Sequence, residues 1–261
     1  MKKIFLILFI LPYIGISQIN FASNNSFDVM TWNLEWFPKQ GSTTIDSIKS
    51  IVEIIDADII ALQEINNTYE FNQLANILDS YSGYSTNSSN LNLAFLYKKT
   101  LEVDSIYTIL HSAEYLFAGR LPLVIETKYG NEEYVVINNH FKCCGDGVLA
   151  YNVTNDEEYR RFRAVSLLKQ YIDSNYTTKN VIILGDLNDL VEENYVNNVF
   201  NPIINDSIHY LIADKYIPSQ NTTNWSYPSW PSHLDHIIIN NNLFDNLIDI
   251  HQDVKTIRVD S

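Results

Sequence analysis

Polar side chains stand at the ends of five strand-like runs that are widely separated in the chain. These side chains are Asn33, Glu64, Asn139, His140, Asp186, Asn188 and Asp235. Each one alone is explained by a turn, a helix cap or a hydrogen bond at a strand end. Together they are residue types that bind metal ions and phosphate, and layered folds build their sites from loops at strand ends. Five strand ends with metal- or phosphate-competent side chains are therefore a candidate site rather than five separate turns.

The segments between these residues predict strands and helices in alternation. We expect strands within 27–34, 57–65, 91–98, 105–110, 121–130, 134–142, 180–186 and 233–240. Helices are expected at 43–58, 68–80 and 157–173, and loops at 81–90 and 224–232. Some strands follow one another as in hairpins, with a turn at Gly130-Asn131, and others are separated by helices. This mixture predicts an α+β (α/β) fold in which two packed mixed β-sheets are flanked by helices.

The first 17 residues, "MKKIFLILFILPYIGIS", have a basic start followed by an apolar run. This pattern is typical of a secretory signal peptide, so residues 1–17 are expected to be removed by a Sec-type pathway. An uncleaved anchor is the alternative, but the apolar run is shorter than the ~20 residues of a spanning helix. We therefore expect a secreted or periplasmic monomer whose single domain covers residues 27–261.

The net charge of −14 argues against binding polyphosphate by bulk attraction. For an anionic substrate, positive charge must come from a few residues or from a metal ion. The two cysteines, Cys143 and Cys144, are neighbours in "HFKCCGDG". We favour a strained vicinal disulfide for this pair; free thiols or a contact with an unidentified metal remain the alternatives.

Six motifs in order carry a resemblance to a known family: "TWNLEWF", "DIIALQEI", "GRLPLVIE", "INNHFK", "ILGDLND" and "HLDHIII". From residue 27 to about residue 240, the chain resembles the endonuclease/exonuclease/phosphatase superfamily. This superfamily includes secreted deoxyribonucleases, abasic-site endonucleases, sphingomyelinases and inositol phosphatases. The resemblance implies a four-layer sandwich and a metal-dependent phosphodiesterase.

The resemblance also implies roles for the residues that hold the cation and the attacking water. Glu64 matches the carboxylate that binds a divalent cation, usually Mg²⁺, with Mn²⁺ or Ca²⁺ as the other hard ions. Asn33 matches an asparagine beside the metal and the scissile phosphate. Asp186 matches the aspartate that orients or deprotonates the water, and Asn188 matches its partner.

Three further positions match residues that act on the phosphate and the leaving group. His140 matches a histidine that contacts the phosphate, and Arg120 matches a position that often supplies a phosphate-binding arginine. Asp235 matches an aspartate that holds a second histidine in its working tautomer.

The family pattern ends with a Ser-Asp-His-x-Pro segment, which does not occur in the sequence. His236 adjoins Asp235 on a strand, so the two side chains are expected on opposite faces, and His251 lacks the motif. We favour a domain that is incomplete at its C-terminus over a complete protein with an impaired site. The chain is therefore expected to be weakly active or inactive as it stands.

The leading function is that of a nuclease whose partner is DNA or RNA as substrate, with endo- or exo-action left open. The run "RRFR" (Arg160, Arg161 and Arg163) suggests contacts to backbone phosphates, although a solvated helix face is the favoured explanation. Trp225, Tyr227 and Trp230 lie in an aromatic loop, which keeps a sphingomyelinase-like phospholipid phosphodiesterase as an alternative. A secreted binding protein that keeps the fold without catalysis is the other alternative.

Overall fold

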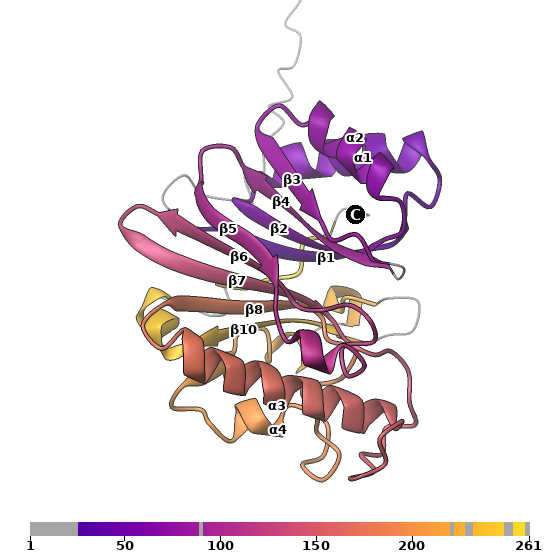
Figure 1. Ribbon diagram of the computed structural model, residues 1–261, viewed down its shortest axis with the longest axis vertical. Helices are drawn as coiled ribbons and strands as arrows, with labels where there is room; N and C mark the ends of the chain where they lie inside the picture. The colour runs from indigo at the N-terminus through magenta and orange to yellow at the C-terminus, as the bar shows by residue number, and fades with distance from the viewer. Residues whose placement is uncertain (1–25, 89–90, 220–221, 228–231, 248–252, 259–261) are drawn as a thin grey trace, which may run out of the picture.

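The computed structural model describes residues 26–88, 91–219, 222–227, 232–247 and 253–258. Two mixed β-sheets pack face to face, and helices cover the outer face of each sheet (Figure 1). The smaller sheet has the order β1 (Val29–Phe37), β2 (Ile59–Ile65), β4 (Asn92–Lys98), β3 (Tyr81–Ser85). The larger sheet has the order β5 (Glu102–Thr108), β6 (Leu123–Tyr129), β7 (Glu132–His140), β8 (Asn180–Asp186), β10 (Asp235–Asn240), β9 (Tyr210–Ile212). The predicted four-layer arrangement is confirmed.

Strand β2 shows why its sequence is apolar at successive positions. Ile59 and Ala61 face the other sheet, whereas Ile60 and Leu62 face the helices. Successive side chains of a strand point to opposite faces, so a strand inside a layered fold is buried on both sides.

Helices α1 (Ser42–Ile55) and α2 (Thr68–Ile77) cover the smaller sheet (Figure 1). Helices α3 (Glu157–Asn175) and α4 (Asn201–Ile204) cover the larger one. The α2 and α3 helices begin at side-chain caps, because Asn67 accepts from Glu70 N (3.2 Å) and Asp156 accepts from Tyr159 N (2.7 Å). Helix α1 instead has Gly41 at its N-cap, a residue that offers no side-chain cap.

Strand register positions three of the polar residues side by side. Strand β7 runs parallel to β8 with His140 opposite Asp186, and β10 runs antiparallel to β8 with Asp235 opposite the same Asp186. On the other sheet, β1 and β2 are parallel with Asn33 opposite Gln63, and the register then shifts.

Residues 81–85 were expected in a loop, and that expectation was wrong. They form edge strand β3, whose Tyr81 hydroxyl donates to Ala57 O at 2.8 Å. Gly83 permits close packing against α2, because a Cβ there would lie 2.6 Å from Ala75 Cβ. The sequence of this strand shows no alternation of apolar and polar residues, since Tyr81 is its one fully buried residue.

Several short elements had no counterpart in the sequence expectations. They are β9, α4 and the 3₁₀ helices η1 (His111–Ala113), η2 (Ile217–Ser219), η3 (Thr222–Asn224) and η4 (Asn241–Asn246). The expected signal peptide, Trp230 and His251 lie outside the described residues. Within the described ranges, no helix has the length and apolar character needed to cross a bilayer.

Candidate active site

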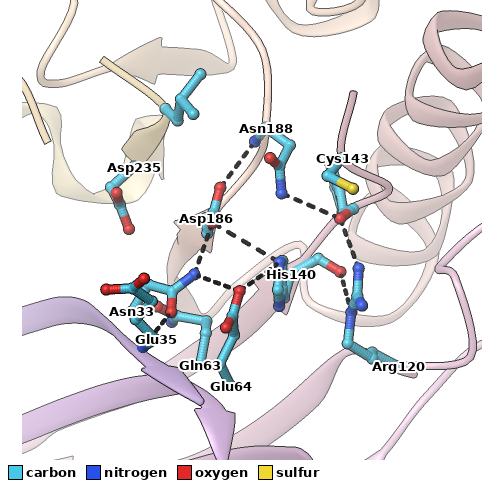
Figure 2. A network of polar contacts seen from close by, with 12 residues as sticks. Asn33, Glu35, Gln63, Glu64, Arg120, His140, Cys143, Asp186, Asn188 and Asp235 are labelled. Carbon is cyan, nitrogen blue, oxygen red and sulfur yellow. Dashed lines mark hydrogen bonds and ion pairs between the residues drawn. The ribbon is translucent and has the colours of Figure 1, made fainter. Parts of the chain in front are cut away.

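A single amide joins the two sheets at the candidate site. Asn33 Nδ2, in the middle of β1, donates to Glu64 Oε1 at 3.2 Å and to Asp186 Oδ2 at 2.8 Å. Figure 2 shows these side chains pointing toward one another, together with His140. The smaller sheet thus supplies Asn33 and Glu64, and the larger sheet supplies Asp186 and His140. The carboxylates of positions 64 and 186, far apart in the chain, converge on one place.

Three carboxylates crowd this place. Burial, the charge of Asp235 and the charge of Glu64 raise the pKa of Asp186 to about 7, although bonds from Asn33 and Asn188 oppose the shift. Burial also raises the pKa of Asp235, whose Oδ1 has no hydrogen-bond partner among the described residues. A buried acid whose pKa is raised by neighbouring carboxylates favours a bound cation. Because hard divalent ions prefer carboxylate and amide oxygens, Glu64 and Asn33 fit such an ion.

His140 is buried beneath the acids. Its Nε2 lies 3.9 Å from Glu64 Oε1 and 3.7 Å from Asp186 Oδ2, and its Nδ1 has no partner among the described residues. Burial and the nearby Arg120 hold its pKa well below the ordinary value. The imidazole is therefore neutral at neutral pH, with one N–H to donate.

Arg120 holds the end of β7. Its Nε donates to His140 O at 3.0 Å and its Nη2 donates to Phe141 O at 2.7 Å. Burial lowers its pKa, and the charges of Asp186 and Glu64 partly offset that effect. Two of its three guanidinium nitrogens thus bind backbone oxygen, and its charge remains beside the acids.

Asn188 closes the turn that follows β8. Its backbone N–H donates to Asp186 Oδ1 at 3.1 Å, and its Nδ2 donates to Phe141 O at 3.2 Å. Asp186 is therefore held at both oxygens, one by Asn188 and the other by Asn33.

Left-handed backbone gathers at this site. Positive φ occurs at Glu35 (45°), Trp36 (63°), Glu64 (61°) and Asn188 (56°), conformations that non-glycine residues rarely adopt. The Trp36 side chain stays 57% exposed, while its backbone N–H donates to Glu64 Oε2 at 3.1 Å. Such unfavourable conformations persist where surrounding contacts enforce them, commonly at functional sites.

The arginines of "RRFR" are not on a solvated face, nor do all three face outward to meet phosphate. Arg161 is 3% exposed; it donates to Asp189 Oδ2 at 2.7 Å and to the carbonyl oxygens of Lys142 (2.7 Å) and Cys144 (2.8 Å). Arg160 is 8% exposed, and only Arg163 lies at the helix surface. The expectation of a solvated face is wrong for Arg160 and Arg161, because helix α3 turns both inward. Asp189, the last residue of "GDLND", is the missed partner.

A second buried polar cluster adjoins the turn after β8 and was not predicted from the sequence. Asp214 Oδ2 lies 2.9 Å from His233 Nε2 and 2.7 Å from His236 Nδ1. His236 Nε2 lies 2.8 Å from Asp189 O, which ties the cluster to the turn after β8. Asp214 raises the pKa of His236 against the effect of burial, and the two histidines lower the pKa of Asp214. The prediction that His236 points away from Asp235 is consistent with these contacts.

Beneath the site, two buried amides also join the sheets. Gln63 Nε2 donates to Asn138 Oδ1 at 2.7 Å, and Asn138 Nδ2 donates to Leu62 O at 2.9 Å. Their positions next to Glu64 and two residues before His140 were the only sequence signal. The cysteine expectation is corrected: Cys143 and Cys144 are free and exposed, with Sγ atoms 3.0 Å apart, well beyond a disulfide bond.

The comparisons with known proteins agree with this geometry. A model of the Endonuclease/Exonuclease/phosphatase family matches residues 30–251. The chain belongs to this family. No curated protein matches it in sequence.

Solved structures of the same fold include proteins from several organisms. D. rerio TDP2 in complex with a single-strand DNA product is 14% identical, with a TM-score of 0.62 over 82% of this chain and 83% of that one. The human Nocturnin catalytic domain with a bound sulfate anion is 17% identical, with a TM-score of 0.57 over 82% of each chain. A Bacteroides thetaiotaomicron mannosyl-6-phosphatase is 12% identical, with a TM-score of 0.56 over 83% of this chain and 86% of that one. At these identities the likeness establishes the fold of this family member.

Proposed function

We propose that this family member is a divalent-metal-dependent phosphodiesterase that hydrolyses nucleic-acid strands. The observation that carries the proposal is the convergence of Asn33, Glu64 and Asp186 across two sheets, joined by bonds of 3.2 and 2.8 Å. A structural role alone does not call for a buried Asp186 whose pKa is raised to about 7 by burial and by the charges of Asp235 and Glu64.

In this proposal Asp186 is the general base. Asn188 N–H and Asn33 Nδ2 each hold one of its oxygens, so the carboxylate keeps one orientation toward the attacking water. A positioned base of this kind contributes roughly 10²- to 10⁴-fold to the rate. Asn188 also helps to place that water and the phosphate.

The proposed cation is Mg²⁺ or another hard divalent ion such as Mn²⁺ or Ca²⁺, held by Glu64 and Asn33. When bound, such an ion offsets the crowded negative charge and polarises a phosphoryl oxygen. Arg120 adds positive charge beside the same phosphate, and neutral His140 donates its N–H to a phosphate oxygen. Asp235 Oδ1, without a partner among the described residues, is suited to orient a further proton donor at the leaving group.

Support for a nucleic-acid substrate comes from the family and from one structural relative. The family model is named for endonucleases and exonucleases as well as phosphatases, and D. rerio TDP2 was solved with a single-strand DNA product. We also propose that residues 1–17 form a cleaved signal peptide and that one monomeric domain begins near residue 27. N-terminal sequencing of protein exported from cells tests the cleavage.

The activity is tested by incubating the full-length protein with plasmid DNA, single-stranded RNA and sphingomyelin, with Mg²⁺ and with EDTA. We expect Mg²⁺ to support hydrolysis of a nucleic acid, EDTA to abolish it, and added Mg²⁺ to restore it. Hydrolysis of sphingomyelin alone would replace the nuclease by a phospholipid phosphodiesterase. Failure to cleave any of these or a generic phosphodiester would favour a non-catalytic binding protein.

A further inference from the structure

An open pocket adjoins the candidate site along the chain. Its lining consists of Glu114, Tyr115, Ala118, Gly119, Lys142 and Arg160. Gly119 directly precedes Arg120, and Lys142 directly follows Phe141, the residue whose carbonyl binds both Arg120 and Asn188. The wall of the pocket is therefore continuous with the backbone that positions the reaction centre.

Positive charge gathers here in an otherwise acidic protein. Arg160 and Arg120 are close enough for the charge of Arg160 to lower the pKa of Arg120, and Lys142 lies on the same wall. Among the described residues, neither arginine forms an ion pair with a carboxylate: their hydrogen bonds go to backbone oxygens. Buried guanidinium groups usually have an acidic partner, so Arg160, which forms no ion pair among the described residues, creates a position for an anion.

Arg160 retains capacity for such an anion. It is 8% exposed, its Nη2 donates to Tyr115 O at 2.5 Å, and its Nε has no partner among the described residues. Lys142 is more exposed; its Nζ donates to Cys143 O at 2.9 Å and lies 3.6 Å from Glu157 Oε1. Glu114 is the one acidic residue in the lining and opposes anion binding.

Tyr115 adds an aromatic surface to the same pocket. The guanidinium carbon of Arg160 lies 4.1 Å from the centroid of the tyrosine ring, and the tyrosine is nevertheless 56% exposed. An aromatic ring backed by arginine and open to solvent is a platform on which a nucleic-acid base stacks without sequence preference. A cation and a stacking platform side by side fit one nucleotide.

We propose that this pocket is a subsite for a second nucleotide of a nucleic-acid strand, with its phosphate at Arg160 and Lys142 and its base on Tyr115. The inference rests on the proposed function, because it assigns to that reaction a substrate longer than one phosphodiester. The positively charged side chains of Arg160 and Lys142 would also allow a protein of net charge −14 to bind a polyanion at one place.

Binding is measured first, by fluorescence anisotropy of a labelled single-stranded DNA decamer in EDTA. Arg160→Gln and Lys142→Gln are each expected to weaken binding by about tenfold, the effect of one charged contact. Each should also reduce the slope of log affinity against log salt concentration by about 0.7, the value for one phosphate contact to a single strand. Tyr115→Leu should weaken binding with little change in that slope, and Glu114→Gln should strengthen it.

Arg163→Gln is the matched control, because Arg163 lies on the same helix α3 but outside the pocket lining. Its affinity and salt slope should equal those of the unmodified protein. Thermal unfolding checks each variant, and Lys142→Gln keeps the test valid if Arg160→Gln does not fold. An unchanged salt slope in a folded Lys142→Gln or Arg160→Gln protein overturns the subsite.

Kinetics then separate the two proposals. With Mg²⁺, the ratio of kcat/KM for a DNA decamer to that for bis(4-nitrophenyl) phosphate, which has a single phosphate, should fall by about tenfold in Arg160→Gln. If the unmodified protein hydrolyses neither compound but still binds DNA through Arg160, the catalytic proposal fails and the subsite stands. If it hydrolyses both and the ratio does not change, the subsite fails and the catalytic proposal stands.

Discussion

Asn33 contributes most to the site at the scale of single residues. One of its amide hydrogens is directed to each of two carboxylates from different sheets, at 3.2 Å for Glu64 and 2.8 Å for Asp186. An aspartate at this position would add a further negative charge to an already acidic cluster, so an amide is required for chemical reasons. Because Asp186 is repelled by two neighbouring carboxylates, the folded protein is less stable when no cation is bound at the site.

Asp186→Asn is predicted to reduce kcat by roughly 10³-fold, because the base is lost while its two neighbours remain. Stability in EDTA should not fall, since the substitution removes one of three mutually repelling carboxylates. Steady-state kinetics and a thermal melt measure the two effects. Asp46→Asn, on an exposed turn of α1, serves as the control that should change neither. Near-native turnover by Asp186→Asn would contradict the role of general base.

The turn "GDLND" is the most constrained element. Its first two residues, Gly185 and Asp186, end strand β8, and at Gly185 φ is +137° and a Cβ would lie 2.0 Å from Asn139 O. This close approach to β7 places Asp186 opposite His140, so the glycine is required by packing as well as by conformation. Asp186 and Asn188 point out of the core because they bind groups of both sheets, Asn33 from one and Phe141 O beside the other. A simple turn would not require these bonds.

Gly185→Ala is predicted to destabilise the protein by roughly 3 kcal/mol or more, through backbone strain combined with the clash against β7. Urea unfolding measures the change. Gly130→Ala provides the comparison, because φ there is +63° but no atom of the described residues lies within 4 Å of the added Cβ. Its cost should be limited to about 1 kcal/mol. Equal losses in the two variants would show that the close approach to Asn139 is not a constraint.

Arg161 fastens helix α3 to this turn and to the loop after β7. It is 3% exposed, and it binds Asp189, Glu158 and two carbonyl oxygens. Arg161→Met is predicted to cost about 3–5 kcal/mol, because two buried carboxylates lose their partner. Chemical denaturation tests this prediction against Arg163→Met, which should cost less than about 0.5 kcal/mol at a surface position. Adding Asp189→Leu to Arg161→Met should recover part of the loss.

At the scale of the whole molecule, buried polar groups connect parts that the hydrophobic cores keep apart. One apolar cluster lies between the sheets and one lies under each helical layer. The Asp214, His233 and His236 cluster links the segment after β9 to strand β10 and to the turn after β8. The turn after β8 is thereby attached both to strand β10 and to the segment after β9.

This cluster predicts a pH dependence of stability. Because Asp214 raises the pKa of His236 above 6.5, the protonated ring stabilises the fold fully below that value. The stabilisation is lost as pH rises through the folded-state pKa, while Asp235 and His233 remain the other titratable neighbours. The difference in unfolding free energy between the unmodified protein and His236→Gln should therefore be larger at pH 6 than at pH 9. Urea unfolding at both values measures it, and Asp214→Asn should remove the same dependence.

The sequence alone determined much of the fold because its signals are local. Alternating apolar runs and strand-end polar residues identified β2, β7 and β8, and helical spacing identified α1 and α3. Six motifs in register identified the family, which the match over residues 30–251 then established. Strand β3 escaped because a polar edge strand is specified by its partner β4 and by Gly83 against α2, neither of which is local in sequence.

Only the tertiary structure decided how the site is held and which charges are free. No local pattern indicates that Arg161 is bound by Asp189 while Arg160 has no acidic partner among the described residues, since the two arginines are neighbours in one basic run. Helix rotation and the return of the chain after β8 assign those partners. Likewise, Asn33 reaches Asp186 only because two sheets pack face to face. Residue type can be read along the chain, but charge compensation depends on what lies nearby in space.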